Sequence, residues 1–328
     1  MDNFFRISTS KYPAPMDQIN LEKKVNIVAL ANNNYAKYLC VTLLSILENS
    51  KVQDRVKFCF SILDREITEK SKFLIESCLK SRSHKNFEFD WIPLSSSYIE
   101  KRFGFLLKNL KTVQNFPVYL TFDACNLVRS TSDKIICIDS DTLVLGDILE
   151  LWDIPMDDYP TLAAIDLGFP RFKYRQWPMH KFPKAFKQCH PQTPYFNSGV
   201  VVIDVQKWKK LDIPEIALIE AITAVKEDPS SLEYSEQDPL NLAWKGNVKQ
   251  MHLEWNAQSS LFFKPNSRMQ MENIDVETAI QSPKIVHYTM PYCKPWRPNC
   301  THPLAHLYQP YLSYVERHFS QYERINFF

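Results

Sequence analysis

Two aspartates spaced two residues apart follow a short apolar run in the stretch KIICIDSDTLVLGDI, residues 134–148. The apolar residues 135–138 predict a buried strand, and Asp139 and Asp141 stand where that strand should end. Asp is unfavourable in strands, and a buried carboxylate without a partner is costly. On extended chain both side chains point to the same side, about 6–7 Å apart, and can share one hard cation such as Mg²⁺ or Mn²⁺. The alternative is a solvated turn, because Asp-x-Asp is a common tripeptide.

A second group of candidate residues lies in KIVHYTMPYCKPW, residues 284–296. His287 follows a short apolar run, and a neutral imidazole is a suitable third ligand for Mn²⁺. Lys294 stands seven residues later and can offer a point charge to a phosphate. A core histidine and a surface lysine are the alternative interpretation.

Two further segments place polar residues beside apolar elements. In PYFNSGVVVIDVQKW, Asn197 and Ser198 stand at the start of an expected strand, where they can meet a sugar hydroxyl. A plain turn before the strand would look the same. In YSEQDPLNLAW, Glu236, Gln237 and Asp238 come just before an apolar helical run. Capping of the helix by this acidic group is the alternative there.

The elements that must position these residues alternate between strand and helix. Strands are expected at 25–31, 56–63 and 87–94, with helices at 35–49 and 68–80, the latter capped by Thr68. This alternation predicts a parallel sheet covered on both faces, with ligands bound at the carboxyl ends of its strands. NNNY, which follows the first strand, and DSD should therefore lie on one edge of the sheet.

The later part of the chain predicts more elements of both kinds. Strands are expected at 161–167, 199–205 and 284–288. A helix is expected over 212–228, capped by Asp212, with Ile216, Ile219, Ile222 and Val225 on its apolar face.

Composition excludes several classes of protein. The 328 residues carry 39 basic and 37 acidic side chains, a net charge of +2, so no bulk field favours nucleic acid as a partner. No apolar run approaches the roughly 20 residues that cross a bilayer, and the first residues lack the pattern of a signal peptide. The eight cysteines are scattered through apolar patterns, which favours a reducing compartment and a cytoplasmic protein.

The small number of glycines limits how a phosphate could be bound. The chain has only five, and all are isolated, whereas dinucleotide and P-loop motifs need two or three within a few residues. If the protein binds a nucleotide, charge neutralisation by a metal is the natural substitute for a glycine-rich loop.

The segments ANNNYAKYL, IICIDSDTLVLGDI, YFNSGVVVID, EQDPLN and HYTMPYCKPW, in this order, resemble glycosyltransferase family 8. The resemblance runs from about residue 25 to 296. It implies the GT-A fold, a Rossmann-like α/β architecture whose mostly parallel sheet carries helices on both faces. It also implies a retaining enzyme that moves a hexose from a UDP-sugar to a saccharide acceptor in the synthesis of lipopolysaccharide, capsule or another surface glycan. We expect an N-terminal extension over 1–20, the glycosyltransferase domain over 21–300 and a helical tail over 301–328.

By matching position, the resemblance assigns roles to individual residues. The implied metal ligands, for Mn²⁺ or Mg²⁺, are Asp139, Asp141 and His287. The implied donor-binding residues are Asn32, Asn34 and Tyr35 at the uridine, Ser140, Asn197 and Ser198 near the metal and sugar, and Met290 and Lys294 near the diphosphate. The implied catalytic residues are Glu236, Gln237 and Asp238 beneath the sugar ring and Asp166 at the junction of donor and acceptor. An amide is a poor nucleophile, which favours retention without a covalent intermediate.

Four positions depart from the family pattern. Glu236 replaces an aspartate, Asn32 replaces the first-strand aspartate, Met290 replaces a glycine, and Asn126 replaces an arginine. Arg129 could compensate for the last change. Asn126 and Met290 favour the alternative of a non-catalytic relative that binds nucleotide-sugar or carbohydrate.

The acceptor side and the tail allow further interpretations. Residues 170–190 carry six Lys/Arg, several aromatics and no acid, which suits an anionic or lipid-linked saccharide or else a basic surface loop. The aromatic tail could dock on the core or give peripheral contact with the inner face of a membrane. A zinc-structured interaction module is a third hypothesis, suggested by the cysteines and histidines at positions 293, 300, 302 and 306.

Overall fold

The computed structural model describes residues 23–51, 56–83, 85–110, 113–128, 133–175, 184–232, 234–263, 269–270, 272 and 274–325. The strands are β1 Lys23–Asn32, β2 Val56–Arg65, β3 Asn86–Pro93, β4 Lys134–Ile138, β5 Thr142–Val144, β6 Thr161–Ile165, β7 Phe196–Asp204, β8 Lys249–Gln250, β9 Ala257–Gln258 and β10 Ile285–His287. The α-helices are α1 Ala36–Asn49, α2 Glu69–Arg82, α3 Ser96–Asn109, α4 Ala124–Leu127, α5 Ile148–Asp153, α6 Phe172–Arg175, α7 Lys184–Gln188, α8 Val205–Lys210, α9 Ile213–Glu227, α10 Gln237–Trp244, α12 Glu277–Gln281 and α13 Ala305–Ile325. The 3-10 helices are η1 Asn33–Tyr35, η2 Val113–Asp123, η4 Leu253–Asn256, η5 Ser259–Phe262 and η6 Pro291–Cys293.

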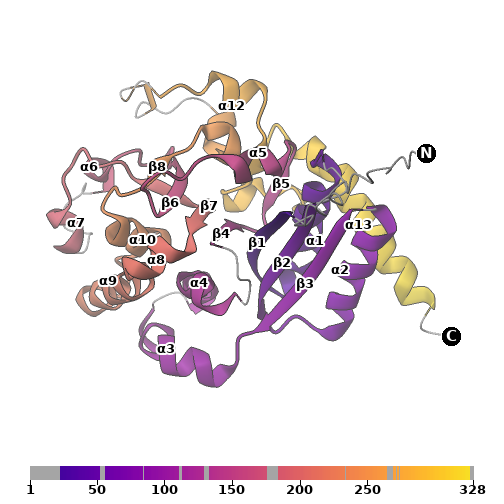
Figure 1. Ribbon diagram of the computed structural model, residues 1–328, viewed down its shortest axis with the longest axis horizontal. Helices are drawn as coiled ribbons and strands as arrows, with labels where there is room; N and C mark the ends of the chain where they lie inside the picture. Colours follow the sequence, from indigo (N-terminus) through magenta and orange to yellow (C-terminus); the bar gives the residue numbers. More distant parts are fainter. Residues whose placement is uncertain are drawn as a thin grey trace, which may run out of the picture.

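A seven-stranded sheet of order β3-β2-β1-β4-β7-β6-β8 forms the centre of the molecule (Figure 1). Strands β3, β2, β1 and β4 run parallel, β7 runs antiparallel to both of its neighbours, and β6 and β8 are parallel. The predicted mostly parallel sheet is therefore confirmed. The switch to an antiparallel β7 matters for the site, because it brings the start of that strand to the carboxyl end of β4.

Helices cover both faces of this sheet, as predicted. Along β1, Val25, Ile27, Ala29 and Ala31 join one apolar core, which includes residues of α1, α2 and α13. The intervening Val28 belongs to a second core with residues of α3, η2, α9 and α10. Burial on both sides explains why this strand is an almost continuous apolar run.

A second sheet of three short strands, in the order β5-β10-β9, lies beside the first. Strand β10 pairs antiparallel with β5, opposing His287 to Thr142, and parallel with β9, opposing His287 to Gln258. This small sheet carries the C-terminal segment to the end of β4.

Helix α9 corrects one detail of the prediction. Its position and the first-turn proline are confirmed, but Asp212 adopts a left-handed backbone (φ 53°) and its side chain makes no capping hydrogen bond. Ile219 is 59% exposed. Of the predicted face, Val225 is buried and Ile216 and Ile222 are half-buried against the core, and Ala217, Ala221 and Ala224 are buried beside them.

The tail helix α13 docks on the core, where it packs against α1 and α2 (Figure 1). Tyr308, Leu312 and Val315 supply its buried face. The eight cysteines form no disulfide with one another in this structure. Within the described ranges, no helix is both long enough and apolar enough to span a bilayer.

Candidate active site

The turn after β4 holds the two aspartates in place. The Asp139 backbone N–H donates to the Gly199 carbonyl on β7 (2.8 Å). The Ser140 hydroxyl donates to the Leu30 carbonyl on β1 (3.0 Å), and the Thr142 hydroxyl donates back to the Asp139 carbonyl (2.9 Å). The turn is thus fixed to both neighbouring strands, so the aspartates project from a rigid edge of the sheet.

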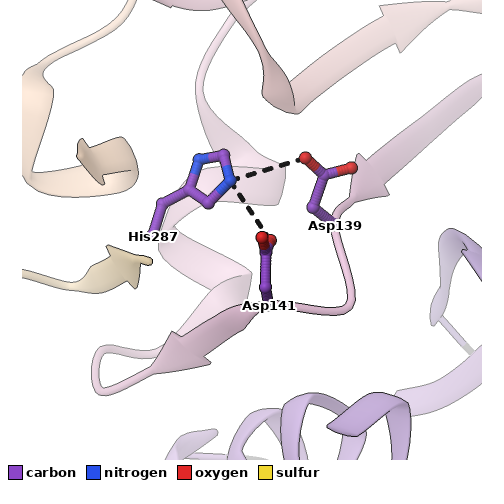
Figure 2. Close-up of side chains that lie close together, drawn as sticks. All are labelled: Asp139, Asp141 and His287. Atoms are coloured by element: carbon purple, nitrogen blue, oxygen red, sulfur yellow. Dashed lines mark ion pairs between the residues drawn. The ribbon is translucent and has the colours of Figure 1, made fainter. Parts of the chain in front are cut away.

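His287 lies against both carboxylates, as Figure 2 shows. Its Nε2 is 3.2 Å from Asp141 Oδ1 and 3.4 Å from Asp139 Oδ2. Pairing of β10 with β5 accounts for this contact, and the Tyr288 N–H donates to the Asp141 carbonyl (3.1 Å). The sequence placed these three residues in one site, and the structure brings them together although the histidine comes from the far end of the chain.

The charges in this group influence one another strongly. Burial alone would lower the pKa of His287, but the carboxylates of Asp141 and Asp139 outweigh it and raise the pKa to about 9. Burial would raise the pKa of Asp141, but the charges of Lys294 and His287 outweigh it and hold that pKa well below its usual range. The Lys294 ammonium contacts Asp141 Oδ2 and donates to the Tyr288 carbonyl (2.5 Å).

These residues fit a divalent cation. Ligand atoms of Asp139, Asp141 and His287 lie within 4.8 Å of one another, and no other group of three such residues occurs in the described ranges. Asp141 Oδ1 is buried and accepts no hydrogen bond. Neighbouring ligands of an octahedral cation with bonds of about 2.1 Å lie about 3.0 Å apart, close to the separations seen here. Two carboxylate oxygens and one imidazole suit Mn²⁺ or Mg²⁺.

A network of buried amides continues from the histidine. His287 Nδ1 is 2.9 Å from Asn256 Oδ1, and Asn256 Nδ2 donates to Asn197 Oδ1 (2.8 Å). Asn197 Nδ2 donates to Gln237 Oε1 (2.9 Å), and Gln237 Nε2 donates to Asp166 Oδ2 (3.1 Å). The sequence analysis named every member of this network except Asn256. No local pattern distinguishes that residue, because it is the last residue of the short helix η4, directly before β9.

A cavity of about 370 Å³ opens beside Asp139 and Asp141. Its wall includes seven of the predicted site residues, namely Asn32, Tyr35, Asp139, Ser140, Asp141, Ser198 and Glu236. Five others, His287, Lys294, Asn197, Gln237 and Asp166, are buried behind this wall and contact it or one another. The edge of the sheet therefore presents a carboxylate group and a deep pocket together, as the positions of NNNY and DSD predicted.

Glu236 is a further carboxylate on the wall of this cavity. Its Oε1 accepts from the Ser198 hydroxyl (3.0 Å). Burial and the nearby charge of Asp139 raise its pKa to about 8. The preceding Ser235 adopts a left-handed backbone (φ 46°), which is uncommon for a residue other than glycine. Glu236 occupies the N-cap position of α10 but makes no capping hydrogen bond, so helix capping does not explain it.

Three predicted residues lie away from the cavity. Asp238 is completely buried in an ion pair with Arg175 (2.7 Å) and accepts from the Tyr195 hydroxyl (2.5 Å). Asn34 is exposed and lines a separate depression beside α2. The Met290 sulfur accepts from the Tyr292 hydroxyl (2.9 Å). Their assigned roles stay predictions.

The basic segment after β6 is less cationic than its sequence indicates. Arg171 and Lys173 both pair with the carboxylate of Glu272, the latter at 2.5 Å, and Arg175 pairs with Asp238. Residues 176–183 of this segment lie outside the described ranges. Of its six cations, three are therefore engaged inside the protein.

The cysteines and histidines near the C-terminal end of the chain, and Asn126 before β4, do not line the cavity. The residues proposed to bind zinc do not assemble: Cys300 donates to the Cys293 carbonyl, while the His302 ring packs against Tyr288 and His306 bonds to the Pro303 carbonyl. Asn126 is exposed on α4 and does not line the cavity. Arg129 lies outside the described residues.

Comparison with known proteins agrees with this geometry. The architecture is that of the GT-A fold. The galactosyltransferase LgtC, solved with donor and acceptor sugar analogues, superposes with a TM-score of 0.68 at 24% identity, over 88% of this chain and 95% of that chain. The chain belongs to glycosyl transferase family 8, whose model matches residues 26–300.

Two relatives span most of the chain. General stress protein A of Bacillus subtilis is 30% identical over 307 residues, covering 89% of this chain and 94% of its own. A lipopolysaccharide 1,2-glucosyltransferase of Escherichia coli is 25% identical over 302 residues, covering 88% of this chain and 77% of its own. The predicted family and fold are both confirmed.

Proposed function

We propose that this glycosyltransferase moves a hexose from a UDP-sugar to a saccharide acceptor, with a divalent cation and with retention of configuration. The observation that carries the proposal is the group Asp139, Asp141 and His287, in which the two aspartates line the cavity and the histidine lies behind them. A cation held there would neutralise the charge of the departing diphosphate. The roles of the surrounding residues follow from where they lie.

The donor lies across the carboxyl edge of the sheet in this proposal. Asn32 and Tyr35, on the cavity wall at the end of β1, contact the uridine. Lys294 sits beside Asp141 with its ammonium buried, and it turns from that carboxylate toward the diphosphate when the donor enters. Asn34 and Met290 lie away from the cavity, and their contacts with the donor remain part of the proposal.

The sugar faces Ser198 and Glu236. The Gln237 carbonyl already accepts from the Asn197 amide and the Ser198 N–H, so it is neither free nor aimed into the cavity. This favours transfer without a covalent intermediate. The bond from the anomeric carbon to the phosphate oxygen breaks with its electron pair leaving on UDP. The acceptor oxygen bonds to the same face of that carbon, and its proton passes to the departing phosphate.

Glu236 then stabilises the positive charge that develops on the sugar, and Asp166 and Gln237 hold the polar floor beneath it. Asp238 acts at a distance, by fixing the start of α10 through Arg175. The acceptor approaches past the segment after β6. The similarity of this chain to lipopolysaccharide glycosyltransferases supports a role in surface glycan synthesis. The acceptor in this proposal is a lipid-linked or anionic saccharide at the cytoplasmic face of the membrane.

Release of UDP tests this proposal. The protein is incubated with UDP-galactose, UDP-glucose and UDP-N-acetylhexosamines, with and without Mn²⁺, beside Asp141→Ala. Asp153→Ala serves as the matched control, because Asp153 is 59% exposed and pairs only with Lys23 on the surface. We expect metal-dependent release from one donor, lost in Asp141→Ala and kept in Asp153→Ala.

The other outcomes discriminate between explanations. Metal-dependent UDP binding without release from any donor, in the presence of saccharide acceptors, would identify a non-catalytic relative of the family. Absence of UDP binding in the presence of Mn²⁺ would contradict the assignment of the site.

A further inference from the structure

We infer that Asn256 is a positioning residue, which makes His287 present Nε2 to the proposed metal site. The orientation of the Asn256 amide is in turn determined by Asp166, through a series of hydrogen bonds in which each donor and acceptor can be assigned. The inference rests on the proposed metal site and adds a residue that neither the sequence motifs nor the family match assigned. Each step depends on groups that can only donate or only accept.

The chain starts at the Asp166 carboxylate, which can only accept. Its Oδ1 is held by the N–H groups of Gly168 (2.9 Å) and Phe169 (3.0 Å). Its Oδ2 accepts from Gln237 Nε2 (3.1 Å), so the carbonyl of that amide must point the other way. The Ser198 N–H, which can only donate, reaches Gln237 Oε1 (3.2 Å) and fixes the same orientation independently.

Asn197 is fixed in the same manner. Its Nδ2 donates to Gln237 Oε1 (2.9 Å) and to Asp166 Oδ2 (3.3 Å). The Gly199 N–H donates to its Oδ1 (3.1 Å). A flipped amide would oppose donor to donor at one end and acceptor to acceptor at the other, so only one orientation satisfies these buried groups.

The orientation of the Asn197 amide then determines the orientation of Asn256 and the position of the proton on His287. Asn197 Oδ1 can only accept, so Asn256 must turn Nδ2 toward it (2.8 Å) and therefore Oδ1 toward His287 Nδ1 (2.9 Å). Nδ1 must carry a proton to donate to that oxygen. In the neutral ring Nε2 is then left with its lone pair, facing Asp141 and Asp139 at 3.2 and 3.4 Å.

The surroundings leave no substitute for Asn256. Its side chain has 0% exposure, so bulk water cannot replace the amide. Strand β9 begins at the next residue and runs parallel to β10, which places Asn256 beside His287. A partner that orients a ligating histidine usually contributes 10- to 100-fold in metal affinity.

The first measurement needs no variant. The protein is loaded with ¹¹³Cd²⁺, and the histidine rings are observed by long-range ¹H–¹⁵N NMR, with His287→Gln to assign the signal. We expect the metal coupled to Nε2 of His287 and a slowly exchanging proton on Nδ1. Coupling of the metal to Nδ1 would overturn the inference.

The second measurement compares Mn²⁺ affinity, by EPR of the free ion, among the wild type and three variants. Asn256→Ala should bind about 10- to 100-fold more weakly. Asn256→Asp keeps an acceptor for His287 and should recover most of that loss, although it cannot donate to Asn197. Asn26→Ala is the control, since Asn26 is equally buried but its amide has no partner, and it should bind as the wild type does.

Equal Mn²⁺ affinity of Asn256→Ala and the wild type would overturn the inference and leave the proposed function standing. Equal weakening in Asn26→Ala would also overturn it, because general loosening of the core would then explain the loss. Failure of the wild type to bind Mn²⁺ would instead refute the proposed metal site. If Asn256→Ala does not fold, the histidine-ring NMR spectrum of the near-isosteric Asn256→Asp is the test instead. We expect Nδ1 of His287 to stay protonated in that variant. Loss of the proton from Nδ1 would count against the inference.

Discussion

Replacing Gly199 with alanine should disable the metal site while leaving the sheet folded. A Cβ at this position would lie 2.1 Å from His287 Cε1, 2.8 Å from its Nδ1 and 2.6 Å from Asp139 Oδ2. Two carbons in contact prefer about 3.5 Å, so the ring must move by about 1.4 Å. The β7 backbone is held against this overlap, because Gly199 accepts from the Asp139 N–H and the following residues, 200–204, pair with β4.

Displacement of a ligand by more than 1 Å typically costs about 100-fold in rate. We expect Gly199→Ala to lower the rate of UDP release by at least about that factor and Mn²⁺ affinity by about 10- to 100-fold, both measured beside circular dichroism of the folded protein. Gly104→Ala is the control, because its Cβ would meet only the flexible Glu100 side chain at 3.2 Å. Alanine in that helix should be neutral or stabilising by up to about 1 kcal/mol. If Gly199→Ala bound Mn²⁺ and released UDP as the wild type does, the close approach of β7 to His287 would not constrain the site.

Three other perturbations have distinct expected results. Mn²⁺ at 100 times its Kd should raise the free energy of unfolding, measured by denaturant titration, by about 2.7 kcal/mol. Asp141→Asn should abolish this increase. An equal increase in the variant would place the ion elsewhere. Arg175→Met leaves the buried charge of Asp238 unpaired and should cost about 3–5 kcal/mol, whereas adding Asp238→Asn should recover much of the loss; full additivity of the two changes would contradict a coupled pair. Without metal, the free energy of unfolding should fall as pH rises from about 4.5 through about 8. Burial and the charge of Asp139 keep Glu236 protonated to a higher pH in the folded state than in the unfolded chain. Glu236→Gln should flatten that part of the urea-unfolding profile, and an unchanged slope would show that another group is responsible.

The sequence was sufficient to predict the parallel half of the sheet and the carboxylate pair at its edge. Strand β4 is short and strongly apolar, and the cost of placing two aspartates directly after it makes a shared partner predictable. His287 and Lys294 were weak candidates from local pattern, because a lone histidine after an apolar run usually has a structural role. The family resemblance then assigned them to the metal and the diphosphate.

Other features depend on contacts between distant segments. Asn256 acquires its role from the pairing of β9 with β10, which no local period reveals. Arg175 belongs to a segment that looks like a cationic surface, and its partner Asp238 lies 63 residues away. In α9 the predicted apolar face is only partly buried, because Ile219 faces the solvent whereas the small Ala217 and Ala221 pack inward.

The small sheet joins strands from distant parts of the chain, so the site can form only late during synthesis. Asp141 leaves the ribosome 153 residues before Lys294, the cation that contacts it. At 5–20 residues per second this interval lasts roughly 8–30 s. Throughout it the emerging chain can pair β1, β2 and β3, but it lacks the histidine and lysine that balance the two aspartates. A chain stalled before β10 therefore already has all seven strands of the large sheet, but the two aspartates at its edge still lack His287 and Lys294. The proposed metal site can be completed only after β10 has been made.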